Sequence, residues 1–469
     1  MSKILVLGGG VIGLSTALML AREGHDITVF EHDAASAPGS PEEAWLAWER
    51  LGVAQFRQPH YVQPAACHLF AHYLPDVRDA LLRAGCETFD MLTIMPPFIT
   101  DRAPREGDER FVTITGRRPA IEYAVASVAE RLLPILRGVS VVGLLTGRPA
   151  AKGIPHVTGV RTMDGKEVSA DLVIDAMGRR SKLPDWLQAF RAHPPIEEAE
   201  DSGFIYYSRY FRSTTGVLPP FPAGLKTDFH SFSVLTLPGD GHTWSVTVYI
   251  SSADQALKKL RDPKHWTALV AACPLHAHFL DGEAITDVLP LGGIIDRYRR
   301  FVVRRDPVAT GILSVGDSWA CTNPSLGRGI AMGLMHALGT VQVVRQHLHD
   351  PLALALAHDA MTETHVTPWF RNTIETDRAR IAQTNALIEG RPGPQPKDPL
   401  ARIGDALLVA MMYDPDLFRA FLEVAALLAL PQEVLARPGM VDRIMEVAGS
   451  HEPVMPPGPT REELLHMLA

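Results

Sequence analysis

The feature that most constrains the fold is a glycine-rich turn near the start of the chain. It reads Gly8-x-Gly10-x-x-Gly13, follows the apolar run at residues 3–8 and precedes a stretch of small and apolar residues. The three glycines of such a turn permit a tight bend, close approach of a pyrophosphate and close packing of helix on strand. Glu31 ends a second apolar run, where a carboxylate can accept hydrogen bonds from a ribose diol. The pattern predicts a strand-turn-helix-strand unit that binds a dinucleotide.

A second motif of this kind lies some 300 residues later. Residues 311–317 read as a buried strand that ends in Gly-Asp, and Asn-Pro-Ser-Leu-Gly-Arg-Gly at 323–329 precedes a helix. Asp317 can hold a ribityl hydroxyl, and the helix N-terminus can face a pyrophosphate or the pyrimidine edge of a flavin. Gly327 and Gly329 let the backbone lie close to a flat ring. A nicotinamide-binding chain does not need this second site, so the two motifs together favour FAD.

Composition excludes several classes of protein. The chain has 469 residues, of which 46% are hydrophobic and 21% charged, which is typical of a folded protein with two or three domains. A net charge of -8 disfavours a nucleic-acid partner, for which a basic stripe is expected. Four scattered cysteines and the absence of a hydrophobic leader predict a cytoplasmic protein. No run of 18 apolar residues predicts a membrane span.

The pattern of residue types along the chain predicts an α/β fold with a Rossmann-type FAD-binding domain, an inserted mixed β-sheet substrate domain and a C-terminal helical region. An aromatic, alternating stretch from 203 to 251 separates the two motifs and is typical of strands. The chain beyond 350 reads as helical, with a proline-rich break at 390–399. The expected parts are 1–200 and 290–350 for the FAD-binding domain, 201–289 for the sheet domain and 351–469 for the helical region.

Three further stretches carry a family resemblance. They are Gly-Val-Ala-Gln-Phe-Arg-Gln-Pro-His at 52–60, Gly-Arg-Arg-Pro at 116–119, and the segment 175–187, which begins Asp-Ala-Met-Gly. With the two motifs, they resemble the FAD-dependent monooxygenases of the aromatic-hydroxylase fold, in particular the epoxidases and hydroxylases of natural-product (secondary) metabolism. The resemblance covers roughly residues 1–350.

The resemblance departs from the family at two positions. Ala54 stands where this branch has proline, and Met177 precedes Gly178 where single-component hydroxylases have aspartate. The second departure bears on direct binding of NAD(P)H. The Trp-x-Trp-x-Ile-Pro signature of the related halogenases is absent, since no two tryptophans lie two positions apart.

The resemblance implies an activity and a set of partners. Reduced FAD would react with molecular oxygen, and a flavin C4a-hydroperoxide would hydroxylate or epoxidise a small to medium apolar organic substrate. Electrons would come from NAD(P)H directly or through a separate flavin reductase. Two alternatives stay open: an FAD-dependent dehydrogenase or reductase, and a non-catalytic flavoprotein subunit.

The resemblance also assigns roles to residues. It places Arg118 against the FAD phosphates or ribityl chain, with Arg117 as the second choice and an ion pair from Arg118 to Glu122 as the alternative. The expected catalytic residues are His60, which suits proton transfer near neutral pH, Arg57, and Pro324 beside the reactive edge of the ring. The expected cofactor-binding residues are Gly8, Gly10, Val11, Ile12, Gly13, Glu31, Gln55, Arg118, Gly178, Gly316, Asp317, Pro324, Gly327 and Gly329.

The aromatic strand is the candidate wall of the substrate site. Tyr206 and Tyr210 share one face of it and Tyr207 the other, and one face is expected to cover the flavin cavity. Core packing alone is the alternative explanation. No metal site is expected, because the Cys-His clusters at 67–72 and 273–278 lack a complete set of four ligands.

Overall fold

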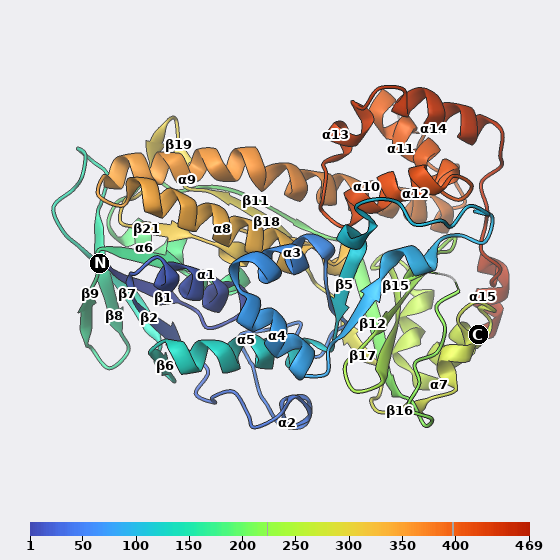
Figure 1. Ribbon diagram of the computed structural model, residues 1–469, viewed down its shortest axis with the longest axis horizontal. Coiled ribbons are helices and arrows are strands. Elements are labelled where there is room, and N and C mark those ends of the chain that lie inside the picture. Colours follow the sequence, from blue (N-terminus) through green and yellow to red (C-terminus); the bar gives the residue numbers. More distant parts are fainter. Residues whose placement is uncertain (223, 396–397) are drawn as a thin grey trace.

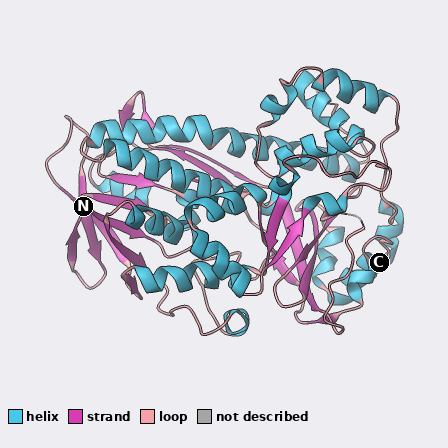
Figure 2. Cartoon of the chain, viewed as in Figure 1, coloured by secondary structure: helices cyan, strands magenta, loops and turns pink. Residues whose placement is uncertain are grey.

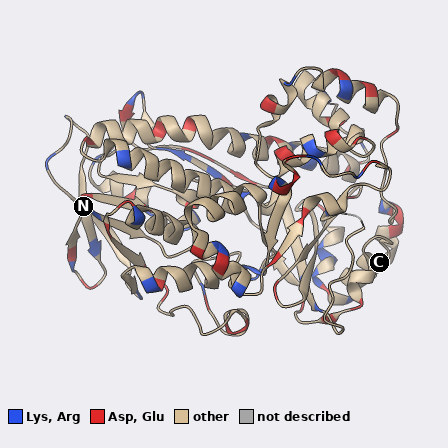
Figure 3. Ribbon diagram, in the orientation of Figure 1, with Lys and Arg blue, Asp and Glu red and all other residues tan. Residues whose placement is uncertain are grey.

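The computed structural model describes residues 1–222, 224–395 and 398–469. A parallel sheet with its helices forms one end of the molecule, and an antiparallel sheet forms the other, with C-terminal helices above it in the view of Figure 1. Figure 2 shows helices packed around strands in the first part, as in an α/β fold. Basic and acidic residues are interspersed along both parts (Figure 3).

Five parallel strands form the central sheet, in the order β21-β10-β1-β2-β6. Residues 4–7 are almost completely buried, because a parallel sheet is covered on both faces. β10 pairs with both β1 and β21, so segments far apart in the sequence meet in one sheet. The strands are β1 (Lys3–Leu7), β2 (Asp26–Glu31), β6 (Ile135–Arg137), β10 (Leu172–Asp175) and β21 (Ile312–Ser314).

Helices cover one face of this sheet, and a small antiparallel sheet covers the other. α1 packs against α5 and α8, and their apolar side chains share one core with the strands. On the opposite face, Leu5 and Leu7 join a separate core with Val157 and Val160. The helices are α1 (Val11–Arg22), α5 (Arg118–Leu132), α8 (Gly329–His347) and α9 (Pro351–His365), and the small sheet contains β7 (Val141–Thr146), β8 (Val157–Thr162) and β9 (Glu167–Ser169).

The second large sheet has the order β13-β14-β15-β12-β16, with β17 also paired to β12. Its described strand pairs are all antiparallel, which corrects the expectation of a mixed sheet. One face packs on α7 and α15, where Leu464 lies in the core. The elements are β12 (Phe204–Arg212), β13 (Lys226–Asp228), β14 (Phe232–Pro238), β15 (Thr243–Ser251), β16 (Glu283–Ala284), β17 (Leu289–Leu291), α7 (Pro263–Ala271) and α15 (Arg461–Met467).

Shorter strands join the two ends of the molecule. β18 pairs with β11 and with β22, which lies just before the second glycine-rich motif. β5 pairs with β3 and β4 and leads into α5. The strands are β3 (Tyr61–Val62), β4 (Glu87–Asp90), β5 (Val112–Thr115), β11 (Ile196–Asp201), β18 (Ile295–Arg300) and β22 (Ala320–Cys321).

The last part of the chain is a group of helices. Asp398 and Asp414 cap α11 and α12, each with proline at the first helical position, which explains where these helices begin. Phe418 and Leu422 pack against Met91 and Phe111, so the group is attached to the N-terminal part of the chain. The helices are α10 (Thr367–Ile388), α11 (Pro399–Ala410), α12 (Pro415–Ala425), α13 (Pro431–Leu435) and α14 (Met440–Gly449).

The predicted fold class is confirmed: an α/β chain with a Rossmann-type sheet, a further sheet and C-terminal helices. The Gly-Arg-Arg-Pro stretch leads into α5, which begins at Arg118 with Pro119 in its first turn. The three boundaries between the four expected parts of the chain stay predictions. No helix among the described residues is both long and apolar enough to cross a membrane.

Candidate functional site

One large cavity runs between the parallel sheet, the antiparallel sheet and the C-terminal helices. Its volume is about 2010 Å³. Pockets that hold a single drug-sized ligand usually measure about 300–1,000 Å³, so this cavity has room for two molecules. Both glycine-rich motifs open into it.

The turn after β1 is shaped as a phosphate cradle. A side chain at Gly8, whose φ is +109°, would place its Cβ 2.4 Å from the Ala176 carbonyl oxygen. A Cβ at Gly13 would lie 2.1 Å from the Gly8 carbonyl oxygen, whereas one at Gly10 would meet no atom within 4 Å. Gly8 and Gly13 therefore allow the packing, and Gly10 leaves open space in front of α1. No side chain caps α1, so its first N–H groups are free to bind an anion.

Glu31 lies at the end of β2 and lines the same cavity. Its carboxylate accepts hydrogen bonds from the Gly9 and Asp33 amides, both at 2.8 Å. Arg50 Nη2 also donates to Glu31 at 3.0 Å, and the same guanidinium contacts Asp33 and Glu122. Arg50 is 5% exposed and fixes the orientation of the Glu31 carboxylate.

The two arginines before α5 differ in what they contact. Arg118 lines the cavity and forms an ion pair with Glu122 at 2.6 Å, so the alternative contact that the sequence left open is present. Arg117 is 2% exposed and binds Asp240 at 2.7 Å and Glu42 at 2.8 Å. Arg117 does not line the cavity, and its candidacy as the second choice for FAD binding is therefore removed.

The second motif packs beside the first and lines the same cavity. Asp317 lies in a short turn after β21 and faces the cavity, where burial raises the pKa of its carboxyl and Arg179 and Arg118 oppose that rise. Gly327 has a left-handed φ of +63°, and a Cβ there would meet Tyr61 at 3.0 Å. A Cβ at Gly329, the first residue of α8, would meet nothing within 4 Å. Two open helix N-termini and two carboxylates around one elongated space fit a flavin dinucleotide.

Gly316 is the one residue of the predicted cofactor set that does not line the cavity. Its φ is +66°, and a Cβ there would meet Ile12 at 3.1 Å. Gly316 therefore shapes the turn that carries Asp317, and its predicted contact with the cofactor is not supported by its position.

His60 lines the cavity just before β3, but it does not titrate near neutral pH. Burial and the positive charge of Arg118 lower the pKa of its imidazole to about 3. The Gln58 carbonyl oxygen can only accept, so Nδ1 carries the proton at 2.9 Å from it. The predicted role in proton transfer near pH 7 is corrected: His60 presents a neutral Nε2 acceptor.

Arg57 and Gln55, on the same loop, lie in different surroundings. Gln55 lines the cavity. The Arg57 guanidinium lies over the Trp45 ring, 4.9 Å from its centroid, and does not line the cavity. A catalytic role for Arg57 is therefore not supported by its position.

The three tyrosines of β12 do not line the cavity either. Tyr207 belongs to the core shared with α7, and Tyr210 packs edge-on against Trp45 at 4.9 Å. The Tyr206 hydroxyl donates to Asn323 Oδ1 at 2.8 Å, and its ring stacks on Tyr249. The cavity face of this sheet is formed instead by other residues, among them Phe204, Leu235 and Tyr249.

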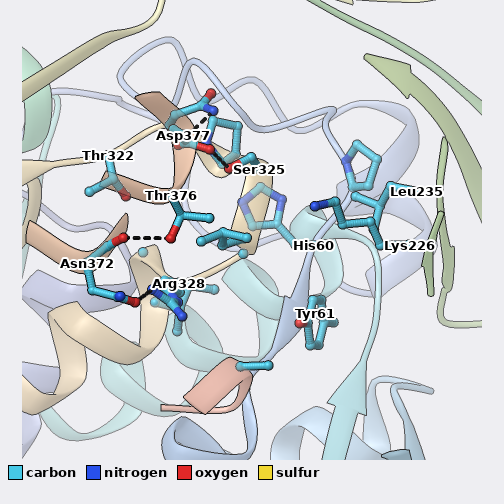
Figure 4. A pocket seen from close by; sticks show the side chains of 18 of the residues that line it. His60, Tyr61, Lys226, Leu235, Thr322, Ser325, Arg328, Asn372, Thr376 and Asp377 are labelled. Carbon is cyan, nitrogen blue, oxygen red and sulfur yellow. Dashed lines mark hydrogen bonds between the residues drawn. The ribbon is translucent and has the colours of Figure 1, made fainter. Parts of the chain in front are cut away.

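A buried polar cluster holds the loop that contains Pro324. Asp377 on α10 accepts hydrogen bonds from Ser325 Oγ at 2.6 Å and from Asn323 Nδ2 at 3.1 Å (Figure 4). The backbone N–H of Asn323 donates to the carboxylate of Asp296. Burial raises the pKa of the Asp296 carboxyl to about 7. The C-terminal helices thus contact the residues beside Pro324 directly.

Arg328 follows the same loop. It donates to Asn372 Oδ1 at 2.7 Å and to Thr373 Oγ1 at 3.1 Å, and it forms no ion pair with any of the described residues. Burial lowers the pKa of its guanidinium to about 10, so it remains charged at neutral pH.

Known proteins share both the sequence pattern and the fold described above. A model described as FAD dependent oxidoreductase matches residues 3–88. PqsL of Pseudomonas aeruginosa, titled a probable FAD-dependent monooxygenase, superposes with a TM-score of 0.60 over 83% of this chain and 99% of its own, at 14% identity. The fold is that of the FAD-dependent monooxygenases. The family resemblance is confirmed at this level.

Other relatives agree with that assignment of the fold. The OxyS anhydrotetracycline hydroxylase of Streptomyces rimosus superposes with a TM-score of 0.57 at 17% identity, over 92% of this chain and 76% of that one. Protein Rv3254 of Mycobacterium tuberculosis is 26% identical over 462 residues, 90% of this chain and 89% of the relative. Zeaxanthin epoxidase of Oryza sativa subsp. japonica is 28% identical over 196 residues, which are 39% of this chain and 26% of the epoxidase.

Sequence reasoning missed Arg50, Asp377 and Lys226. Lys226 lines the cavity from the edge strand β13 and pairs with Asp228 at 3.0 Å. None of the three belongs to a recognisable motif, and each reaches the cavity only through tertiary packing. The region beyond residue 350 was expected to be helical, but no local signal placed its helices against the site.

Proposed function

We propose that this protein is an FAD-dependent monooxygenase that hydroxylates or epoxidises an apolar organic substrate. One observation carries the proposal: a single cavity joins the dinucleotide cradle to an apolar chamber with room for a second molecule. Bound FAD, once reduced, would activate molecular oxygen and deliver one of its atoms to the substrate.

The chain's own residues would bind and orient the cofactor. The N-terminus of α1 at Gly10 would take the pyrophosphate, and Glu31, held by Arg50, would accept from the ribose hydroxyls. Asp317 would accept from the ribityl chain, with Arg118 close enough to lower its pKa. The backbone from Pro324 to Gly327 would lie along the ring.

The walls of the chamber would exclude water and orient the substrate. Leu235, Tyr249 and the C-terminal helices enclose the side opposite the cradle. His60 Nε2, neutral at physiological pH, would accept a hydrogen bond from a substrate or water proton rather than release one. Excluding bulk water would protect the oxygen-activating step from side reactions.

The position before Gly178 bears on the source of electrons. Asp175 is 0% exposed and is held by Ser181 Oγ at 2.6 Å and by the Met177 amide at 3.0 Å. The cavity wall at that position is Met177, so the acidic residue of single-component hydroxylases has no counterpart there. Electrons would come from NAD(P)H directly or through a separate flavin reductase. Location in the cytoplasm also stays a prediction.

Labelled oxygen separates this function from its alternatives. The FAD-loaded protein would be supplied with NADPH, with and without a general flavin reductase, and with a panel of apolar compounds under isotopically labelled dioxygen. We expect one labelled oxygen atom in the product. Turnover without label would show a dehydrogenase, and a protein that binds FAD but transforms no compound under either electron supply would be a non-catalytic flavoprotein.

A further inference from the structure

The outer part of the cavity has an apolar wall that lies apart from the two glycine-rich motifs. Four large apolar side chains line it although they are strongly exposed: Phe98 at 48%, Leu400 at 56%, Leu408 at 50% and Val454 at 40%. We call these four residues the outer wall. Apolar side chains gathered in one hollow indicate a surface that a ligand covers.

The outer wall is built from separate segments that are fixed to the rest of the chain. Leu400 and Leu408 come from α11, whose neighbour Leu407 is buried in the small core with α14. Phe98 lies in the loop before β5, with its ring 5.2 Å from that of Tyr413. Packing within the chain therefore holds these parts of the outer wall in place.

A polar group lies at another part of the same cavity. The side chain of Lys226 points toward His60 in Figure 4. Its ammonium has three donors, and Asp228 accepts at 3.0 Å. Arg380 from α10 also lies 3.7 Å from Asp228, so two cations share one carboxylate. This arrangement favours an oxygen acceptor, charged or neutral, as a further partner of Lys226.

We propose that the second occupant of the cavity, and hence the substrate, is an elongated, mainly apolar molecule with an oxygen acceptor at one end. The apolar part lies against the outer wall, and the acceptor binds Lys226 Nζ near His60. Calling this molecule the substrate rests on the proposed function. The binding of such a molecule can be tested, and can fail, independently of that function. The C-terminal helices then set the length of molecule that the site accepts.

Displacement of a fluorescent fatty acid tests the inference on the FAD-loaded protein. The probe is dansyl-undecanoic acid, and the competitors are straight-chain carboxylates from octanoate to hexadecanoate. We expect affinity to rise about fourfold for each added methylene until the chain reaches the end of the cavity. Saturable binding that does not depend on chain length, or no saturable binding, would overturn the proposal.

Two matched variants locate the apolar contact. Leu408→Gln and Met445→Gln each replace a half-exposed apolar residue of the C-terminal helices, but only Leu408 lines the cavity. We expect Leu408→Gln to weaken probe binding by roughly fivefold to tenfold, from the lost apolar burial, and Met445→Gln to leave it within about twofold of the unsubstituted protein. Equal effects would contradict the assignment of the wall.

Lys226→Met tests the polar end. Hexadecanoate, its methyl ketone and the parent alkane separate an anionic acceptor, a neutral acceptor and no acceptor. The unsubstituted protein should prefer at least one of the two oxygen compounds over the alkane, and Lys226→Met should remove that preference while keeping the dependence on chain length. A preference that survives the substitution would overturn the role of Lys226. Visible absorbance of bound FAD and incorporation of labelled oxygen report separately on the proposed function.

Discussion

At the scale of single residues, alanine substitutions at Gly10 and Gly13 should have different effects although both glycines belong to one motif. A Cβ at Gly10 meets no protein atom within 4 Å, so Gly10→Ala should fold with an unchanged melting temperature in the absence of cofactor. The same methyl group would occupy the proposed pyrophosphate site, and we expect FAD affinity to fall by at least about tenfold, since one lost contact of about 1.4 kcal/mol suffices. Titration followed by flavin fluorescence, with circular dichroism of the apoprotein, measures both.

Gly13→Ala is the contrast to that variant. Its Cβ would lie 2.1 Å from the Gly8 carbonyl oxygen, so the apoprotein itself should be destabilised. Gly143→Ala, in β7 with no atom within 4 Å and outside the cavity lining, controls for loss of a glycine. A Gly10→Ala protein that binds FAD normally would show that the cradle holds something else.

Asp296 gives the protein a pH dependence with a definite sign. Burial raises its pKa to about 7, above that of an unfolded aspartate, so the folded form binds the extra proton between pH about 4 and about 7. The free energy of unfolding therefore decreases as the pH rises from about 4 to about 7, because Asp296 loses its proton in the folded protein. We expect Asp296→Asn to melt at nearly the same temperature as the unsubstituted protein at pH 4 and at a higher temperature at pH 8, with a gain of at most about 4 kcal/mol.

Thermal unfolding at both pH values checks the prediction for Asp296. Asp185→Asn, at a side chain that is 70% exposed, is the matched control and should show no such difference. A difference of the opposite sign would mean that folding lowers the pKa of Asp296 and would contradict the prediction.

At the scale of elements, α10 links the C-terminal helices to the loop that carries Pro324. Asp377→Ala removes the acceptor for Ser325 and Asn323 and leaves two buried donors unsatisfied, which costs about 2 to 4 kcal/mol. We expect the absorbance bands of bound FAD to shift, because the loop beside the ring loses its support. Asp377→Asn, which keeps one acceptor oxygen, should show a smaller shift of these bands than Asp377→Ala.

Arg378→Ala distinguishes this support from a general effect on the helix. Arg378 is exposed, lies one position later on α10 and does not line the cavity. It should leave the flavin spectrum and the melting temperature unchanged. If Asp377→Ala lowers stability without altering the spectrum, the contact is structural only.

Elements also explain which parts of the site the sequence could predict. The turn at Gly8–Gly13 rests on local geometry and was predicted correctly. The alternation of Tyr206 and Tyr207 in β12 was also readable, but not the elements that would cover each face. Tyr206 came to support Asn323, and Tyr207 entered the core with α7. His60 was recognised as a cavity residue, yet its low pKa arises from burial and Arg118, which only the fold determines.

At the scale of the whole molecule, buried polar contacts tie the two large sheets together. Arg117 binds Asp240, and Ser208 donates to Gln58 at 2.9 Å. We therefore expect one cooperative unfolding transition. Cys67 and Cys273 are buried and unpaired in different hydrophobic cores and can report on each part separately.

Thiol labelling across a urea series, with each cysteine identified by mass spectrometry, measures this cooperativity. Cys67 and Cys273 should become reactive at the same urea concentration, since two-state unfolding exposes both cores together. Labelling of Cys273 at a lower concentration would show that the antiparallel sheet unfolds independently. Cys86 and Cys321, also buried and unpaired, provide an internal repeat of the measurement.

The order of strands in the parallel sheet has a consequence for synthesis of the protein. β1 leaves the ribosome early, but its partner β10 follows much later, and β21 lies about 300 residues after β1. At about 5–20 residues per second, translation of that interval takes about 15 to 60 s. During this interval one edge of the parallel sheet lacks a partner, first β1 until β10 has emerged and then β10 until β21 has emerged. Completion of the proposed cofactor site is therefore a late event in translation, because it requires β21 and α8.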